Sequence, residues 1–222
     1  MAILDKNSII QKYKEFLEKY DDVWGYGNSI LYDMCENAPR HDRDDVIVAK
    51  IWLIGRSYSA AVERRKTKDG LSGDEFYRIK VAPKIREISK ELDGRIELLN
   101  DKKGDISGSI KEILETHLFL VNLLKEITEM EKRSFVSKYL HFHCPDMFFI
   151  YDSRARSAIR KMINAPDKSI LSKCDDYEKE YADFVCRMIE LKRLLEDNNT
   201  KITPRQLDEF LLYMEEKDKT RD

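Results

Sequence analysis

The stretch SIKEILETHLFLVNLLKEI, residues 109–127, decides the fold class of this chain. Apolar residues recur in it at three- and four-residue steps, and Ser109 and Glu112 have the spacing of a capping box at a helix start. The apolar positions lie nearly all round the predicted helix, so we expect it to be central and buried. Its longest apolar run, 118–124, is too short to cross a bilayer.

The same helical period recurs on both sides of this stretch. Further helices are predicted over 8–20, 47–62, 75–99, 134–143, 153–162, 177–195 and 203–214. The 8 Gly and 5 Pro of the chain leave little room for the turns of an all-β protein. The sequence therefore predicts an all-α, compact multi-helix globular fold over 1–222. The polar tract 100–108 is a candidate boundary between two helical lobes that flank a cleft.

Capping residues predict several of the helix starts. Ser8 is placed to cap the first helix, Pro83 suits a first turn, and Asp152 opens the helix over 153–162. Thr203 and Gln206 form a second capping box around Pro204. In contrast, the segment DDVWGYGN, residues 21–28, interrupts the helical period with two glycines.

Charge is balanced overall but unevenly distributed. Lys and Arg total 40 against 42 Asp and Glu, which gives a formal net charge of −2 and excludes a global polycation. Two stretches, 50–68 and 131–161, concentrate basic residues and interleave them with aromatics, as a site for a phosphate backbone and unstacked bases requires. The alternative is an ordinary solvated face over core aromatics. The candidate DNA-contacting residues are Lys50, Arg56, Arg64, Lys132, Arg133, Lys138, Arg154, Arg156 and Arg160.

Cysteine spacing and the first residues set the expected compartment. The four cysteines lie far apart without a C-x-x-C pair, and the first residues show no basic segment followed by an apolar one. We therefore expect free thiols in a cytoplasmic protein, with no membrane span, no metal site and no cofactor. His141, His143 and Cys144 would spread over different faces of one short helix, which disfavours a shared metal ion.

The most informative segment for function runs from Ser134 to Ser157. It reads SFVSKYLHFH, then CPDMFFIY, then DSRARS, and it predicts a helix, a short proline loop, an apolar approach and an aspartate that opens a basic helix. Backbone N–H groups and the helix dipole favour an ionised carboxylate at that position. Asp152 can serve there as a helix cap alone or as a functional carboxylate.

These residues resemble the later half of the helix-hairpin-helix DNA glycosylase superfamily. The likeness covers about thirty residues, in the order Phe-x-x-Lys-Tyr-Leu-x-Phe, then Pro-x-x-Phe-x-Ile-Tyr-Asp-x-Arg. Asp152 matches the aspartate that opens a helix in that family, and the late QLDEFL, residues 206–211, is similar to a closing helix of distant members. The resemblance implies the helix-hairpin-helix glycosylase fold and excision of a base from DNA by a protein that acts as a monomer.

The chain also departs from that family. The family's glycine-rich hairpin is missing, since 129–134 reads EMEKRS. Lys132 lacks the motif of the family's lyase lysine and Lys138 is too close to the aspartate, so we expect a monofunctional enzyme. The degenerate hairpin suggests an unusual or modified base as substrate, for example in phage defence.

The resemblance gives the candidate residues defined roles. Breaking an N-glycosidic bond builds positive charge on the sugar, which the carboxylate of Asp152 would stabilise. A base that has left the duplex needs a pocket with stacking and hydrogen-bonding groups. The candidates for that pocket are Trp24, Tyr26, Asn28, His141, His143 and Tyr151. Core anchoring is the alternative role for Trp24 and Tyr26, and a polar helix face is the alternative for the two histidines.

A non-enzymatic role is the competing hypothesis. A helical module could bind DNA or a protein partner through the two basic stretches without releasing a base. The Arg-to-His spacing of a helical HEPN-type ribonuclease is absent, and Gly25-Tyr26-Gly27 is too short to cradle phosphates. Salt-sensitive DNA binding without base release would select the binding module over the glycosylase.

Overall fold

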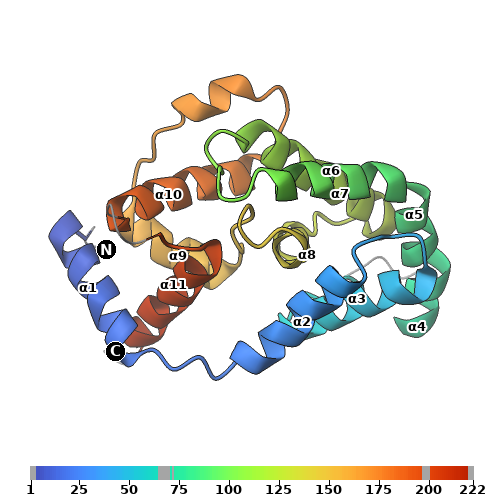
Figure 1. The fold of residues 1–222 in the computed structure, drawn as a ribbon, viewed down its shortest axis with the longest axis horizontal. Coiled ribbons are helices and arrows are strands. Elements are labelled where there is room, and N and C mark those ends of the chain that lie inside the picture. Colours follow the sequence, from blue (N-terminus) through green and yellow to red (C-terminus); the bar gives the residue numbers. More distant parts are fainter. Residues whose placement is uncertain (1–3, 65–70, 72, 197–200, 220–222) are drawn as a thin grey trace.

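The structure is a computed structural model that describes residues 4–64, 71, 73–196 and 201–219. Across those residues the regular elements are all helical, and they pack into one compact body (Figure 1). The prediction of an all-α fold is therefore confirmed.

The helices follow one another with short connections. They are α1 (Lys6–Lys19), α2 (Gly25–Asn37), α3 (Asp44–Ser57), α4 (Gly73–Glu75), a π-helix (Phe76–Val81), α5 (Ala82–Glu87), α6 (Ser89–Asp101), α7 (Ile110–Thr128), α8 (Arg133–His143), α9 (Ser153–Met162), a 3-10 helix (Ser169–Lys173), α10 (Lys179–Leu195) and α11 (Pro204–Lys219). The tract 100–108 holds the end of α6 and the turns before α7. A lobe boundary at that tract stays a prediction.

Helix α8 is the centre of the molecule. Every residue from Phe135 to His143 is buried, and α2, α3 and α7 all pack against α8 (Figure 1). Helix α7 buries one broad face but leaves Asn122, Lys125 and Glu126 exposed. Apolar periodicity therefore identified α7 as a core helix and predicted α8 as a helix, but it missed the central position of α8, whose buried residues include Ser137, Lys138 and two histidines.

The helices from the two ends of the chain lie together beside α9 and α10 (Figure 1). Tyr13 of α1 meets Phe210 of α11 edge to face, with ring centres 5.1 Å apart. Phe16 packs on the same ring at 5.7 Å, and Lys217 pairs with Glu15 at 3.0 Å. Helix α11 also makes the most extensive contact with α9, and this contact fixes the helix that Asp152 opens.

Several predicted helix starts differ from the observed ones. Asp5, not Ser8, caps α1, because its carboxylate accepts the backbone N–H of Ser8 at 3.1 Å. Ser109 precedes α7 without a capping hydrogen bond, and its hydroxyl is buried without a partner, so the capping box predicted there is wrong. The second box is confirmed: Thr203 N–H donates to Gln206 Oε1 at 2.9 Å, and Gln206 N–H donates back to Thr203 Oγ1 at 3.2 Å.

Two glycines allow close approaches in the fold, and one of them stands where the sequence did not predict a helix start. Gly25 begins α2 within the segment that was predicted to interrupt the helices. Glycine suits this position because a Cβ would meet the Asp22 carboxylate at 2.5 Å. Gly55 lets α3 approach the backbone of Ala61, where a Cβ would stand 3.1 Å from Cα. The range 75–99 divides into four consecutive helices, with Pro83 in the first turn of α5 as predicted.

Candidate functional site

Asp152 opens α9 from an extended backbone conformation. Its Oδ1 accepts the backbone N–H groups of Arg154 and Ala155, each at 2.9 Å, so the predicted cap is confirmed. The side chain keeps 21% of its surface exposed. One carboxylate oxygen is thus held by the helix start, while the group as a whole can still be reached from solvent.

Lys138 of α8 lies beside this carboxylate. Its Nζ is 4.0 Å from Asp152 Oδ2, and it donates to Ser134 Oγ at 2.8 Å and to the Tyr151 carbonyl at 3.3 Å. Only 3% of the side chain is exposed, and burial lowers the pKa of Lys138 although Asp152 and Asp208 act in the opposite direction. Sequence spacing had set Lys138 aside as a lyase lysine, yet it is the cation that the fold places next to Asp152.

A second group of polar side chains adjoins this pair from α11, α3 and α2. Arg205 donates to Tyr58 Oη at 2.6 Å, and Tyr58 donates in turn to Asn28 Oδ1 at 2.7 Å. The Lys138 Nζ lies 6.0 Å from the centre of the Tyr58 ring, which links the two groups. Sequence analysis proposed Asn28 but missed Tyr58 and Arg205 as site residues, because they come together only through the packing of three helices.

Asp208 is the most deeply buried carboxyl of this cluster. It is 1% exposed, its Oδ1 has no hydrogen-bond partner, and Arg205 approaches Oδ2 only to 3.7 Å. Burial raises the pKa of Asp208 to about 7, with a further contribution from Asp152, against the effects of Arg205 and Lys138. The cluster therefore holds a carboxyl group that is partly protonated near neutral pH.

A hollow of about 410 Å³ lies next to Lys138, between the turn after α3 and the turn before α8. Ser134 lines the hollow and also accepts the hydrogen bond from Lys138, whose Nζ lies 4.0 Å from Asp152 Oδ2. The hollow is therefore connected to Asp152 through Ser134 and Lys138. Arg64 and Lys132 stand on its wall, and Lys132 donates to the Arg64 carbonyl at 2.5 Å. The hollow combines these two basic residues and the acidic Glu131 with the apolar surface of Phe135, Met130 and two alanines.

The six candidates for a base pocket do not lie together. Trp24 and Tyr26 are 72% and 82% exposed, so they are not core anchors, and they do not line the hollow beside Lys138. Tyr151 is buried, with its N–H donating to Ser137 Oγ at 3.0 Å. Of the six, two contact the cluster around Lys138: Asn28 Oδ1 accepts a hydrogen bond from Tyr58, and the Tyr151 carbonyl accepts one from Lys138.

The two candidate histidines are buried side chains of α8, so they do not form an exposed polar face of that helix. His141 Nδ1 donates to the Phe148 carbonyl at 2.8 Å, so its Nε2 accepts the Tyr32 hydroxyl at 2.7 Å. Burial lowers the pKa of His141 to about 4 and that of His143 well below its usual value. His143 packs on the rings of His41 and Tyr139. The rings of His141 and His143 are neutral core groups, and His143 also lines a separate hollow of about 470 Å³ together with Tyr32 and Phe142.

The candidate DNA-contacting residues differ strongly in exposure. Lys50 is fully buried and donates to the Arg40 carbonyl at 3.2 Å, so its assignment to a DNA surface is wrong. Lys138 is buried as well and is equally unable to reach a phosphate. Arg154 and Arg160 are exposed on α9. Arg65, Lys66 and Lys68 of the first basic stretch lie outside the described residues.

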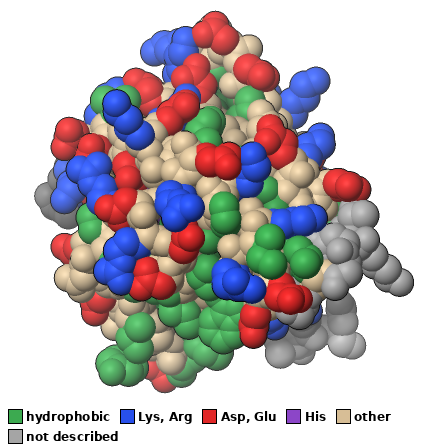
Figure 2. All heavy atoms as spheres, turned by 90° about the vertical axis from the view of Figure 1, so that its right-hand side faces the viewer, with side chains coloured by type: hydrophobic (Ala, Val, Ile, Leu, Met, Phe, Trp, Pro, Cys, Tyr) green, Lys and Arg blue, Asp and Glu red, His purple; other side chains and the backbone are tan. Residues whose placement is uncertain are grey.

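Three of the remaining arginines, Arg56, Arg133 and Arg156, are engaged by carboxylates, whereas Arg64 donates to the Ser59 carbonyl at 3.1 Å. Arg133 lies between Glu178 at 2.6 Å and Glu180 at 3.0 Å, and Arg156 meets Glu180 at 2.7 Å. Arg56 pairs with Glu63 and stacks over Trp52 at 5.7 Å. Figure 2 shows one face of the molecule with Lys and Arg side chains interspersed among Asp and Glu, and hydrophobic side chains gathered along its lower part. That face is not a continuous basic field.

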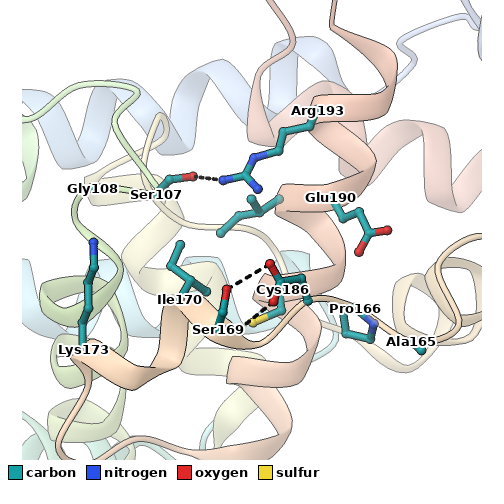
Figure 3. Close-up of a pocket in the computed structure, with 12 residues that line it drawn as sticks. Ser107, Gly108, Ala165, Pro166, Ser169, Ile170, Lys173, Cys186, Glu190 and Arg193 are labelled. Atoms are coloured by element: carbon teal, nitrogen blue, oxygen red, sulfur yellow. Dashed lines mark hydrogen bonds between the residues drawn. The ribbon is translucent and has the colours of Figure 1, made fainter.

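A larger hollow, of about 820 Å³, lies between α10, the 3-10 helix and the turn before α7 (Figure 3). Arg193 donates to Ser107 Oγ at 3.3 Å across it, and Asp167 accepts both Ser169 Oγ and Ser169 N–H at 2.9 and 2.8 Å. These polar groups satisfy one another, and the charged side chains of Lys173 and Glu190 complete the lining.

Two further properties concern the described residues. None of their His, Cys, Asp and Glu side chains form a group of three or more suited to hold a metal ion. No helix in this part of the chain has the length and apolar character to cross a membrane. Comparisons with protein-family models, with curated proteins and with solved structures found no match for this chain.

Proposed function

We propose that this protein is a DNA N-glycosylase that releases a damaged or modified base, with Asp152 as its catalytic carboxylate. One observation carries the proposal: a partly exposed carboxylate is fixed by two N–H groups at a helix start and lies 4.0 Å from a buried ammonium group. A carboxylate in that setting is already oriented and does not need to reorganise when positive charge develops nearby. The resemblance of residues 134–157 to the helix-hairpin-helix glycosylases supports the same role.

The reaction fits the groups around Asp152. The bond between the sugar C1′ and the base nitrogen breaks, and its electron pair leaves with the base. Asp152 stabilises the positive charge on the sugar until water adds to C1′, and the proton that this water loses passes through solvent to the nitrogen of the departed base. Lys138 is held by Ser134 and Tyr151 and is almost fully buried, so its role is to position Asp152 electrostatically while water supplies the new bond. The reaction is therefore hydrolysis without a lyase step.

The hollow beside Lys138 is the proposed site for the base that leaves the duplex. Its volume of about 410 Å³ lies within the range of ligand pockets. Arg64 and Lys132 on its wall supply positive charge for the adjacent phosphates, and the ring of Phe135 supplies apolar surface. This assignment replaces Trp24, Tyr26 and the two histidines as the base-pocket candidates.

Asp152→Asn tests the catalytic role. Asn caps a helix about as well as Asp, so we expect an unchanged melting temperature together with a loss of base release of about a hundredfold or more. Duplexes that carry a panel of damaged and modified bases would be incubated with the protein and heated in alkali to reveal abasic sites. Asp5→Asn is the matched control, because Asp5 makes the same kind of cap at the start of α1.

The competing function is a DNA-binding module without catalysis. Its support is that the two hydrogen bonds from α9 already account for Asp152 as a structural cap. Base release by the wild type that Asp152→Asn leaves at full rate would remove Asp152 from the mechanism. Salt-sensitive DNA binding with no base release on any duplex of the panel would favour the binding module.

A further inference from the structure

The start of α2 exposes an unusual group of apolar side chains. Val23, Trp24, Tyr26 and Ile30 are 73%, 72%, 82% and 48% exposed. Tyr26 and Ile30 lie four residues apart in α2 and share one face of it, and Val23 and Trp24 lie in the turn just before the helix. The buried side of α2, in contrast, is formed by Asn28, Leu31 and Cys35. We call the four exposed residues the α2 patch.

The backbone beneath the α2 patch is fixed by hydrogen bonds. Val23 N–H donates to the Asp21 carbonyl at 2.9 Å, Gly25 N–H to the Asp22 carbonyl at 3.1 Å, and Asn28 N–H to the Trp24 carbonyl at 2.9 Å. The Asn28 side chain joins this turn to Tyr58 of the central cluster. An apolar surface that is already ordered loses little conformational entropy when a partner covers it.

The charged residues of the segment 20–39, which contains the α2 patch, are all acidic. Residues 20–39 contain Asp21, Asp22, Asp33 and Glu36, all exposed, and no Lys or Arg, although the chain has 40 of them. Two arginines of neighbouring helices, Arg56 of α3 and Arg205 of α11, are already paired with Glu63 and Glu209. Of the basic residues that flank this stretch, Arg40 is paired with Glu97 and Lys19 is exposed at the end of α1, so the rim of the patch consists mainly of carboxylates.

This charge decides between kinds of partner. Carboxylates repel the phosphates of nucleic acids and of anionic membranes, so the exposed rings of Trp24 and Tyr26 are poorly placed for either. Large exposed aromatic side chains with a polar rim are typical of protein interfaces, where Trp and Tyr contribute most of the binding energy. We propose that the α2 patch binds a basic amphipathic segment of a partner protein, with its apolar side on Trp24 and Tyr26 and its Lys or Arg residues on Asp21, Asp22 and Asp33.

Tryptophan fluorescence can report this contact directly. The chain has two tryptophans, Trp24 and Trp52, so Trp52→Phe leaves Trp24 as the sole reporter in an otherwise complete protein. The probes are an 18-residue peptide of leucine and lysine in a helical amphipathic pattern and the same pattern with glutamate in place of lysine. We expect the leucine–lysine peptide to shift Trp24 emission to shorter wavelength saturably, with a micromolar dissociation constant that weakens with salt.

Variants separate the α2 patch from unspecific attraction. Tyr26→Ala and the double variant Asp21→Asn, Asp22→Asn should each weaken the leucine–lysine peptide at least tenfold. Ile79→Ala is the matched control, because Ile79 is 49% exposed but lies in the π-helix, and it should leave binding unchanged. Circular dichroism of each variant would verify that the helices are intact.

Four outcomes would overturn the proposal. The first two are equal binding of the leucine–glutamate peptide and no response of Trp24 emission to either peptide. The third is an emission shift caused by a 20-base-pair duplex or by anionic vesicles in place of the basic peptide. The fourth is a concentration-dependent shift without peptide that Tyr26→Ala abolishes. The last result would identify a second copy of this chain as the occupant. None of these results depends on base release, so the inference and the proposed glycosylase activity can fail separately.

Discussion

Asp208 carries a measurable consequence of burial at the scale of a single residue. Its usual pKa of 3.8 is raised to about 7 by desolvation in the folded protein. The folded state therefore holds this proton up to a higher pH than the unfolded chain does. Stability from that proton is complete below pH 4 and is lost as the pH rises to 7, by up to about 4 kcal/mol.

Asp208→Asn should consequently stabilise the protein at high pH. The amide is neutral at every pH, so the variant avoids the cost of ionising a buried carboxyl. We expect its free energy of unfolding in urea to match the wild type near pH 4 and to exceed it by a few kcal/mol at pH 8. Asp33→Asn, at an exposed carboxylate, is the control. An equal difference at both pH values would contradict the assigned cost of ionisation.

The end of α7 shows how a single backbone angle tests an element. Glu129 terminates this helix in the left-handed region, with φ 59° and ψ 18°, where glycine lacks the steric cost of a Cβ. Glu129→Gly should therefore stabilise the protein by about 1 kcal/mol in denaturant unfolding. Glu131→Gly, two residues later, should not stabilise it. A loss of stability in Glu129→Gly would show that the side chain contributes more than the strained angle costs.

Helix α9 gives the element-scale test of DNA binding. Arg154 and Arg160 are exposed on it, whereas Arg156 is held by Glu180. If α9 faces the phosphate backbone, Arg154→Glu with Arg160→Glu should weaken binding to every duplex alike and reduce its salt dependence. Lys90→Glu with Lys103→Glu makes the same charge change at exposed positions of α6 and the following turn. Equal losses in both double variants would place the contact elsewhere.

Elements that follow apolar spacing were predictable from the sequence, whereas α8 was only half predictable. The spacing in residues 109–127 and the Thr203–Gln206 box located α7 and α11, and Asp152 was found because a cap acts through local hydrogen bonds. The burial of Lys138 was not predictable, since its partners Ser134 and Tyr151 become effective only once α8 is enclosed. Arg205 and Asp208 escaped notice because periodicity assigns charged residues to the solvent side.

At the scale of the whole molecule, the four histidines affect how the stability of the fold depends on pH. All four are buried, and desolvation lowers the pKa of each of them: His41, His117, His141 and His143. An unfolded histidine accepts a proton near pH 6.5, while folded His141 does so only near 4 and His117 near 3. The contribution of His141 and His117 to stability is therefore complete above pH 6.5 and falls as the pH drops toward 4, by about 3 kcal/mol each, and His41 and His143 act in the same direction.

Acid should consequently destabilise the protein well before its carboxylates titrate. Asp208 acts in the opposite direction over part of this range, so the measurement belongs in the Asp208→Asn variant. We expect its free energy of unfolding in urea to decrease by several kcal/mol between pH 7 and pH 4.5. A constant value over that interval would show that the buried histidines are protonated without cost in the folded state.

The contact between α1 and α11 has a topological consequence. The ion pair of Lys217 and Glu15 joins residues 202 positions apart in the sequence, and the rings of Tyr13 and Phe210 pack together between the same two helices. The terminal helices α1 and α11 therefore lie side by side (Figure 1), with the end of α11 near the end of α1 and Leu4 at the other end of α1, so a peptide that runs the length of α1 could join the two ends while the backbone is opened at another turn. Gly104, in the exposed turn after α6, has room for such an opening. The order of helices along the backbone is then separable from their arrangement in space.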